Sequence, residues 1–225
     1  MFKKEEVLPV VDAADVARKL KLDYSRGIKD QNEKAVEAVN ELWARIWQPE
    51  VDMRTLAKET CEMICKRFGI ASAGIALRSP IDGLYRYEAV VGLSEESSAS
   101  FMKICYNKEQ LLDPTVYKSY EISKYSKLFL GEDHPYAVGE ESTYVHPGLI
   151  GIKRRALTDS LEADYIDTFI PDESGEIAGY IEITGTRLRK LPDTTTIKWM
   201  EHIAFMLGAA MRLRASTPKE TQRTQ

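Results

Sequence analysis

The stretch that most constrains the fold is ADYIDTFIPDESGEIAGYIEITG, residues 163–185. Two runs rich in isoleucine, tyrosine and phenylalanine flank the four residues DESG, and Asp, Ser and Gly are residues that tight turns favour. This pattern predicts a β-hairpin. Because an isolated hairpin has little stability in water, other parts of the chain must cover one of its faces.

The two faces of this hairpin differ in chemistry. With residues 172–175 as the turn, we expect Tyr165 opposite Glu182. The same register places Asp167 opposite Tyr180. One face then carries Ile166, Ile170, Ile177, Ile181 and Ile183. The other carries Tyr165, Asp167, Phe169, Tyr180 and Glu182. Such a split indicates an apolar face against helices and a second face that is either solvated or the wall of a polar cavity.

A second hairpin is predicted over residues 71–91. ASAGIALRS and LYRYEAVV are short β-prone runs, and PIDG between them supplies turn residues. One face combines polar or aromatic side chains with small ones, namely Arg78, Tyr85, Tyr87, Gly74, Ala76 and Ala89. Small residues beside tyrosine and arginine leave room for a ligand recess.

Helical patterns surround the hairpins. Residues 29–48 place Val36, Val39, Trp43, Ile46 and Trp47 on one helical stripe before Pro49. Residues 52–68 predict a helix from an Asp N-cap to a following Gly, 94–106 a short helix, and 193–214 a closing amphipathic helix. Residues 107–160 are less regular and include STYVHPG and IKRR, which indicates a long excursion over the surface.

Composition excludes several classes. With 31 Lys and Arg against 35 Asp and Glu, the net charge of −4 offers no general attraction to nucleic acid or anionic membranes. The N-terminal residues lack a signal-peptide core, and the longest apolar run, IAFMLGAAM, is too short to span a bilayer. We therefore predict a cytoplasmic protein with no nucleic-acid or membrane partner.

The residues that usually carry catalysis form no motif. Cys61 and Cys65 lie on an apolar helix face, and Cys105 has no evident activating neighbour. The three histidines, His134, His146 and His202, have no metal-ligand spacing. Arg187, Arg189 and Lys190 follow the last strand without a Gly-rich phosphate cradle. We predict that the protein is not an enzyme and binds no metal.

The order of elements carries a resemblance. YIDTFIPDESGEIAGYIEITGTRLRKLPDTTTIKWMEHIAFMLGAAMRL resembles the C-terminal half of a GAF domain, with Gly175, Gly179, Pro192 and Asp193 in the matching places. MRTLAKETCEMICKRFGIASAGIALRSP is similar to the first helix and strand of that family. The stretch from STYVHPG to the closing helix is most similar to GAF modules of archaeal and bacterial signalling histidine kinases.

The resemblance implies an α+β fold: a central antiparallel sheet with N- and C-terminal helices on one face and a cap of loops and short helices on the other. It implies an N-terminal helical extension over 1–49, a GAF-like domain over 50–214 and a flexible tail over 215–225. No kinase region follows the GAF-like part in this chain, so we expect either a stand-alone sensor module or a fragment of a larger sensor.

The function implied is a sensory or regulatory module of a signal-transduction system. A small molecule bound between sheet and cap would act through the terminal helices on a signalling partner protein or kinase, and the chain would form a homodimer. The candidate ligand-binding residues are Arg78, Tyr85, Tyr87, Tyr144, His146, Arg155, Tyr165, Asp167, Tyr180 and Glu182, with Arg154 beside them. The pattern names no cofactor. Two alternatives stay open: a thiol- or haem-dependent redox protein that uses Cys105, and a ligandless interaction or dimerisation domain.

Overall fold

The two predicted hairpins form the centre of one antiparallel sheet in the computed structural model, which describes residues 31–133, 141–144, 146–150 and 152–216. Strands β1 (Ala73–Arg78) and β2 (Tyr85–Val91) make the first hairpin, and β6 (Tyr165–Pro171) and β7 (Ile177–Ile183) make the second. Within the described chain the sheet has seven strands in the order β3-β2-β1-β7-β6-β5-β4. The outer strands are short: β3 (Cys105–Tyr106), β4 (Tyr120–Glu121) and β5 (Ser126–Phe129).

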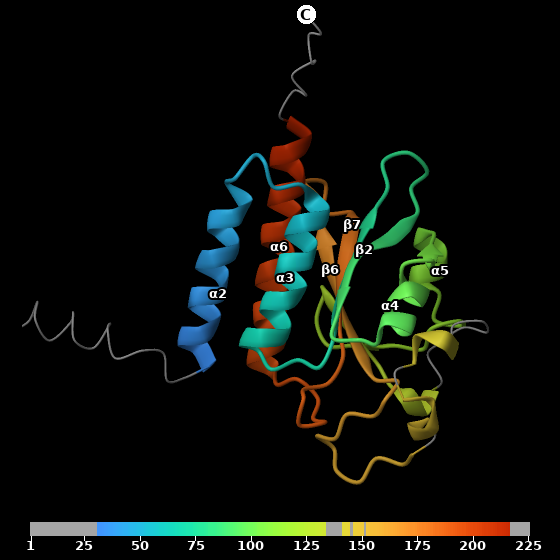
Figure 1. The fold of residues 1–225 in the computed structure, drawn as a ribbon. Helices are drawn as coiled ribbons and strands as arrows, with labels where there is room; N and C mark the ends of the chain where they lie inside the picture. Colours follow the sequence, from blue (N-terminus) through green and yellow to red (C-terminus); the bar gives the residue numbers. More distant parts are fainter. Residues whose placement is uncertain (1–30, 134–140, 145, 151, 217–225) are drawn as a thin grey trace, which may run out of the picture.

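Helices cover both faces of this sheet, as Figure 1 shows. Helix α3 (Met53–Arg67) and helix α6 (Thr194–Ser216) pack on one face, and α2 (Gln31–Ile46) lies against them on the outside. The other face carries α4 (Glu95–Phe101), α5 (Lys108–Leu112) and short 3-10 turns at Gly131–Asp133, Glu141–Thr143 and Pro147–Leu149. We call this second layer the cap. The expected α+β architecture is confirmed.

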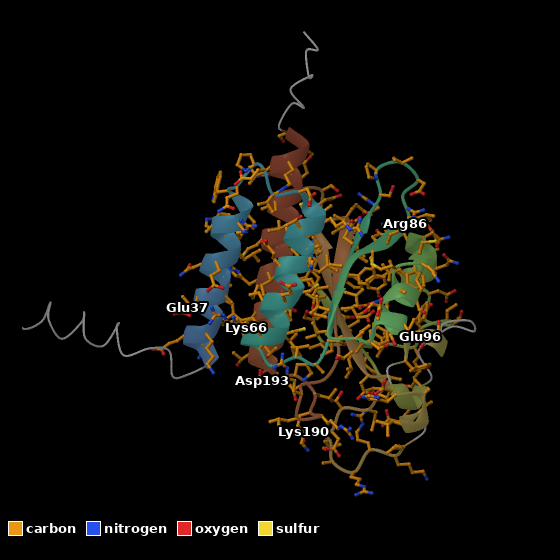
Figure 2. All side chains as sticks on the ribbon, in the orientation of Figure 1. Glu37, Lys66, Arg86, Glu96, Lys190 and Asp193 are labelled. Carbon is orange, nitrogen blue, oxygen red and sulfur yellow. The ribbon has the colours of Figure 1, made fainter. Side chains whose placement is uncertain are left out.

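The main core lies between the sheet and helices α3 and α6. Ile75, Ile181 and Ile183 from the strands meet Ile64, Met200 and Leu207 from the helices, and all are at most 1% exposed. Burying each such side chain contributes about 1.5–3 kcal/mol. Charged residues of α2 and α3, such as Glu37 and Lys66, lie on the outer surface (Figure 2).

The ends of α3 and α6 follow from local sequence. Asp52 accepts a hydrogen bond from the Thr55 backbone N at 2.7 Å, which caps α3, and Gly69 follows the helix with a φ of 66°. Asp193 accepts a hydrogen bond from the Thr196 backbone N at 2.7 Å and caps α6 in the same way. Both carboxylates also interact favourably with the positive end of the helix dipole.

The register of the β6–β7 hairpin differs from the expectation by two residues. Asp167 pairs with Glu182, and Phe169 pairs with Tyr180. The connection between Pro171 and Ile177 is one residue longer than expected, and Ala178 is an extra residue in β7. A shift of two keeps most side chains on their expected faces, but the bulge moves Ile177 to the second face.

A bulge also changes the first hairpin. Ile75 pairs with Ala89, whereas Ala76 pairs with Tyr87, so that Glu88 is the extra residue in β2. Ala89 therefore joins the main core and does not share a face with Tyr87, contrary to the expectation. Alternating hydrophobicity does not reveal a bulge, because one extra residue reverses every face beyond it.

Helix α2 buries only part of the stripe predicted for residues 29–48, together with residues outside that stripe. Its buried side chains are Ala35, Ala38, Leu42 and Ile46. Val36, Trp43 and Trp47, which share the predicted stripe with Ile46, are 48%, 42% and 60% exposed. Helix α2 packs on α3, where Arg45 pairs with Glu59, and small alanines suit this close helix contact. The outer face of α2 thus keeps an apolar stripe.

No helix in the described ranges is both long and apolar enough to cross a membrane. Of the expected N-terminal extension, the structure describes residues 31–49 only, and 217–225 of the expected tail lie outside the described residues.

Candidate functional site

Two buried carboxyl groups lie side by side on the second face of the sheet. Asp167 on β6 and Glu182 on β7 are direct cross-strand partners and are 3% and 9% exposed. Burial and then the neighbouring Glu182 raise the pKa of Asp167 well above its usual range, and Lys127 acts in the opposite direction. Like charges on adjacent residues in a poorly hydrated site disfavour the doubly ionised pair.

Small residues on β1 allow tyrosines to reach these acids. The Tyr87 hydroxyl on β2 donates to Glu182 Oε2 at 2.6 Å, although β1 lies between β2 and β7. The ring crosses β1 above Gly74, where an added Cβ would lie 3.0 Å from Tyr87 Cε1. Gly74 therefore permits the hydrogen bond that holds Glu182.

Aromatic rings surround the acid pair. Tyr87 makes edge-to-face contacts with Phe101 of α4 and with Tyr180, at centroid distances of 5.1 and 5.7 Å. Phe129 stacks on Tyr165 at 4.4 Å. These rings enclose a cavity of about 20 Å³, which we call the acid–tyrosine cavity. It is lined by Tyr87, Phe101, Ile104, Tyr106, Leu111, Tyr117, Phe129, Tyr165, Asp167, Tyr180 and Glu182.

One oxygen of Asp167, a residue that lines this cavity, has no hydrogen-bond partner among the described residues. Asp167 Oδ1 is fully buried and accepts no hydrogen bond from any described residue. A buried polar atom without a partner costs about 1–3 kcal/mol, so native structures usually retain one for a reason.

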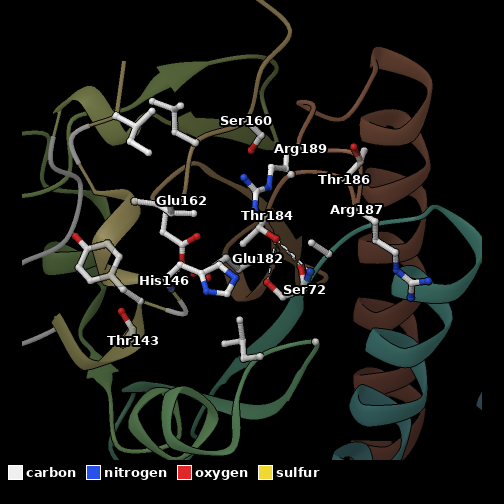
Figure 3. A pocket seen from close by; sticks show the side chains of 18 of the residues that line it. Ser72, Thr143, His146, Ser160, Glu162, Glu182, Thr184, Thr186, Arg187 and Arg189 are labelled. Atoms are coloured by element: carbon white, nitrogen blue, oxygen red, sulfur yellow. Dashed lines mark hydrogen bonds between the residues drawn. The ribbon is translucent and has the colours of Figure 1, made fainter. Parts of the chain in front are cut away.

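A larger cavity of about 320 Å³ lies where the central strands end, and we call it the strand-end cavity (Figure 3). Its polar side chains come from Ser72, Thr143, Tyr144, His146, Ser160, Glu162, Glu182, Thr184, Thr186, Arg187 and Arg189. Its apolar lining includes Leu93, Phe101, Leu149, Ile152 and Leu161. Glu182 and Phe101 line both cavities.

The sheet side of this cavity is built by strand pairing. Because Ala73 of β1 pairs with Ile183 of β7, the residues just beyond these strands meet. The hydroxyls of Ser72 and Thr184 lie 2.9 Å apart and hydrogen-bond (Figure 3). The following turn contains Arg189 with a φ of 55°. Figure 3 shows the Arg189 side chain directed toward the centre of the cavity and that of Arg187 directed toward the helices.

Hydrogen bonds tie the cap to the rest of the wall. Ser97 Oγ of α4 donates to the Tyr144 carbonyl at 3.3 Å. The His146 backbone N donates to Glu162 Oε1 at 2.6 Å. The cap residues around this cavity are therefore positioned by α4 and by the segment that precedes β6.

Arg154, which the sequence suggests as a possible ligand-binding residue, forms ion pairs with acidic residues of the protein itself. Its guanidinium donates to both carboxylate oxygens of Asp164 at 2.9 Å, and to Glu132 at 2.8 Å. Asp164 is 1% exposed and also accepts from the Gly131 backbone N at 2.9 Å. These acids raise the pKa of Arg154. The arrangement fastens the surface excursion next to β6.

The structure places the ten candidate residues in three groups. Tyr144, His146 and Glu182 line the strand-end cavity. Tyr87, Tyr165, Asp167, Tyr180 and again Glu182 line the acid–tyrosine cavity. Arg78, Tyr85 and Arg155 line neither. Arg78 pairs with Asp172 at 3.1 Å, the Tyr85 hydroxyl donates to the Ile177 carbonyl at 2.7 Å, and Arg155 is exposed.

Sequence reasoning missed most of the hydroxyls in the strand-end cavity. Ser72, Thr184 and Thr186 stand just outside strands, where short polar residues are ordinary. Only the pairing of β1 with β7 brings these residues to the cavity, and the sequence pattern of each hairpin does not predict that pairing.

The cysteines and histidines outside these cavities have ordinary surroundings. Burial raises the pKa of Cys61 well above its usual range and that of Cys65 to about 11, so both remain thiols at neutral pH. Cys105 is exposed and lines neither cavity. Within the described ranges no group of three or more His, Cys, Asp or Glu residues is arranged to hold a metal. His202 is exposed, and His134 lies outside the described residues.

No protein-family model and no curated protein sequence matches this chain. Solved structures match its fold. The GAF domain of nlh2 from A. aeolicus, in an inactive state, aligns with a TM-score of 0.53 and 17% identity over 82% of this chain and 99% of that domain. The GAF domain of a phosphoenolpyruvate-protein phosphotransferase from Acinetobacter aligns with a TM-score of 0.53 and 10% identity over 83% and 97%.

A third match is the phycoerythrobilin-bound GAF domain of a cyanobacterial phytochrome, with a TM-score of 0.51 and 13% identity over 82% of this chain and 95% of that domain. At such identities the similarity concerns the fold, and it agrees with the element order and the covered antiparallel sheet. This chain has the fold of a GAF domain.

Proposed function

We propose that this chain is a cytoplasmic sensory or regulatory module of a signal-transduction system, which binds a small molecule between the sheet and the cap. The observation that carries the proposal is the strand-end cavity. Its volume of about 320 Å³ falls within the usual range for small-molecule sites, and its walls combine apolar side chains with a few polar ones. The phytochrome GAF domain with the same fold is bilin-bound, which agrees with ligand binding by this architecture.

The connections to the helices support a relay. Ala71 and Ser72 line the cavity a few residues after α3 ends, and Thr186 and Arg189 line it a few residues before α6 begins. The Arg187 backbone N donates to the Gly69 carbonyl at 2.9 Å, which joins the two segments. A ligand that moves this wall would shift α3 and α6 together, provided that it binds the two positions of the wall with different affinity.

The exposed stripe on α2 supports the dimer as part of this proposal. Val36 and Trp43 on α2, and Trp47 just after the end of that helix, are exposed apolar residues on the side away from the sheet, and Trp is enriched at protein interfaces. The double substitution Trp43→Glu and Trp47→Glu should convert a dimer to a monomer in light scattering, whereas Ile81→Glu, at a 94% exposed hairpin tip, should not. A monomeric unaltered chain would exclude the dimer.

Ligand binding is tested by native mass spectrometry of the purified chain, followed by a metabolite thermal-shift screen. A retained or stabilising molecule should no longer bind after Leu149→Trp, which places an indole on the cap side of the cavity. Leu157→Trp is the matched control, because Leu157 belongs to the same excursion and is 93% exposed. An empty chain that responds to no compound would favour a ligandless interaction domain.

The proposal assigns binding to this site, and the thiols give little support to the redox alternative. Among the described residues, no cysteine lines the strand-end cavity. Cys61 and Cys65 are buried, and burial raises the pKa of both thiols. A redox role for Cys105 has the simplest test, because Cys105→Ser should leave ligand binding unchanged if the proposal is right.

A further inference from the structure

The acid–tyrosine cavity has a chemistry that the proposed pocket alone does not specify. Asp167 and Glu182 line it from adjacent strands, and Asp167 Oδ1 has no hydrogen-bond partner among the described residues. The remaining walls are mainly aromatic rings. Negative charge together with aromatic rings is an environment that attracts an organic cation, since the face of an aromatic ring carries negative potential.

We infer that the ligand of this module carries a positively charged nitrogen, which binds between Asp167 and Glu182, while its organic body occupies the strand-end cavity. The inference rests on the proposed function and specifies the class of ligand: small organic ammonium compounds. The two cavities share Glu182 and Phe101 in their linings and are therefore neighbours, which places the organic body of such a ligand next to its charged end. The inner cavity of about 20 Å³ has the size of one water molecule or one ammonium group.

The basic residue that pairs with Asp167 across the sheet does not take the position of that cation. Lys127 on β5 is the cross-strand partner of Asp167. Its Nζ lies over the Phe169 ring, 5.7 Å from the ring centroid, and Asp167 Oδ1 remains without a hydrogen bond. Lys127 lowers the repulsion at a distance but leaves the carboxyl oxygen available.

The donor set favours an ammonium group over a hard metal ion. Calcium and magnesium require about six or more oxygen ligands, and this cavity offers two carboxyl groups and tyrosine hydroxyls between aromatic walls. Burial makes an unneutralised pair of acids unfavourable. A monocation bound between them offsets that cost and would displace the proton that one acid otherwise retains.

The test uses cations and their uncharged counterparts on the full chain. Ethanolamine and 3-aminopropanol are compared with ethylene glycol and 1,3-propanediol by calorimetry and thermal unfolding, with sodium chloride at equal ionic strength. We expect at least one of the two amines to bind and its counterpart not to bind. Asp167→Asn and Glu182→Gln should each weaken that binding about tenfold or more. Glu173→Gln, which removes a charge from the exposed turn of the same hairpin, should leave it unchanged.

Three outcomes of this comparison of cations would overturn the inference. The first is equal binding of an amine and its uncharged counterpart, and the second is amine binding that survives both acid substitutions. The third is a response to ammonium chloride that equals the response to the amines, which would assign the site to an inorganic cation. If a neutral or anionic metabolite binds and only Leu149→Trp abolishes its binding, the ammonium inference fails and the proposed function stands.

Discussion

The two faces of the central sheet are made by the same strands but are stabilised differently. The face toward α3 and α6 is a continuous apolar core in which Ile75, Ile181 and Ile183 are at most 1% exposed. The face beneath the cap carries Asp167 and Glu182 among tyrosines. The first face supplies most of the hydrophobic stabilisation, and the second gives up some of it for polar groups that are costly to bury.

This difference separates folding from function within single strands. Along β7, Ile181 and Ile183 face the helices, and Tyr180 and Glu182 face the cap. Buried polar groups without complete hydrogen bonding persist where they have a role, so the second face is where binding is expected. Substitutions on the two faces should therefore affect different measurements.

The largest effect is expected from truncation on the helix-covered face. Ile181→Ala removes a fully buried side chain and should lower the free energy of unfolding by about 2–5 kcal/mol, as measured by urea denaturation. Ile177 lies on the same strand but is turned to the second face by the bulge at Ala178 and is only partly buried. Ile177→Ala should cost less, and an equal cost would contradict the proposed division between the faces.

A smaller effect is expected at the glycine that admits Tyr87. In Gly74→Ala the new Cβ would lie 3.0 Å from Tyr87 Cε1, so that the ring must move. We expect a loss of about 1–3 kcal/mol in urea denaturation, together with a change in the near-ultraviolet dichroism of the tyrosines. Gly148→Ala is the control, because nothing lies within 4 Å of its added Cβ. Unchanged dichroism in Gly74→Ala would show that Tyr87 is not held as described.

The two faces also differ in how much of their structure can be predicted from the sequence. Both hairpins, α3, α6 and the acid–tyrosine face were predicted, because each follows from local periodicity and from capping or turn residues such as Asp52 and Gly175. The register of Asp167 was predicted wrongly, since a longer turn and a bulged Ala178 together shift the pairing by two. Bulges depend on packing between strands and leave little trace in one sequence.

The strand-end cavity shows the same limit on a larger scale. Ser72 and Thr184 are 112 residues apart in sequence, and they meet because β1 pairs with β7. Arg154 is basic and close to His146 in sequence, which suggests a ligand-binding residue. In the structure its guanidinium group binds the Asp164 carboxylate. Long-range pairing and the choice of ion-pair partner are properties of the assembled fold and are not encoded by local spacing.

The isosteric substitution Asp167→Asn makes the smallest change to a side chain, and it tests the second face most specifically. Burial and the adjacent Glu182 raise the pKa of Asp167 in the folded protein above its ordinary value of 3.8, with Lys127 in partial opposition. Its contribution to stability is therefore fully present below pH 3.8 and is lost as pH rises toward the folded-state pKa.

Asp167→Asn removes this titration. The stability of the variant relative to the unaltered chain should rise with pH from about pH 4 upward, by at most about 1.4 kcal/mol per pH unit. Urea denaturation at a series of pH values measures the difference, and Glu173→Gln on the exposed turn should show none of this pH dependence. Parallel pH profiles for the Asp167→Asn variant and the unaltered chain would mean that Asp167 is not held in a poorly hydrated site. In that case the two faces of the sheet would differ less than their side chains suggest, and the carboxyl pair would lose its role as the feature that distinguishes the face beneath the cap.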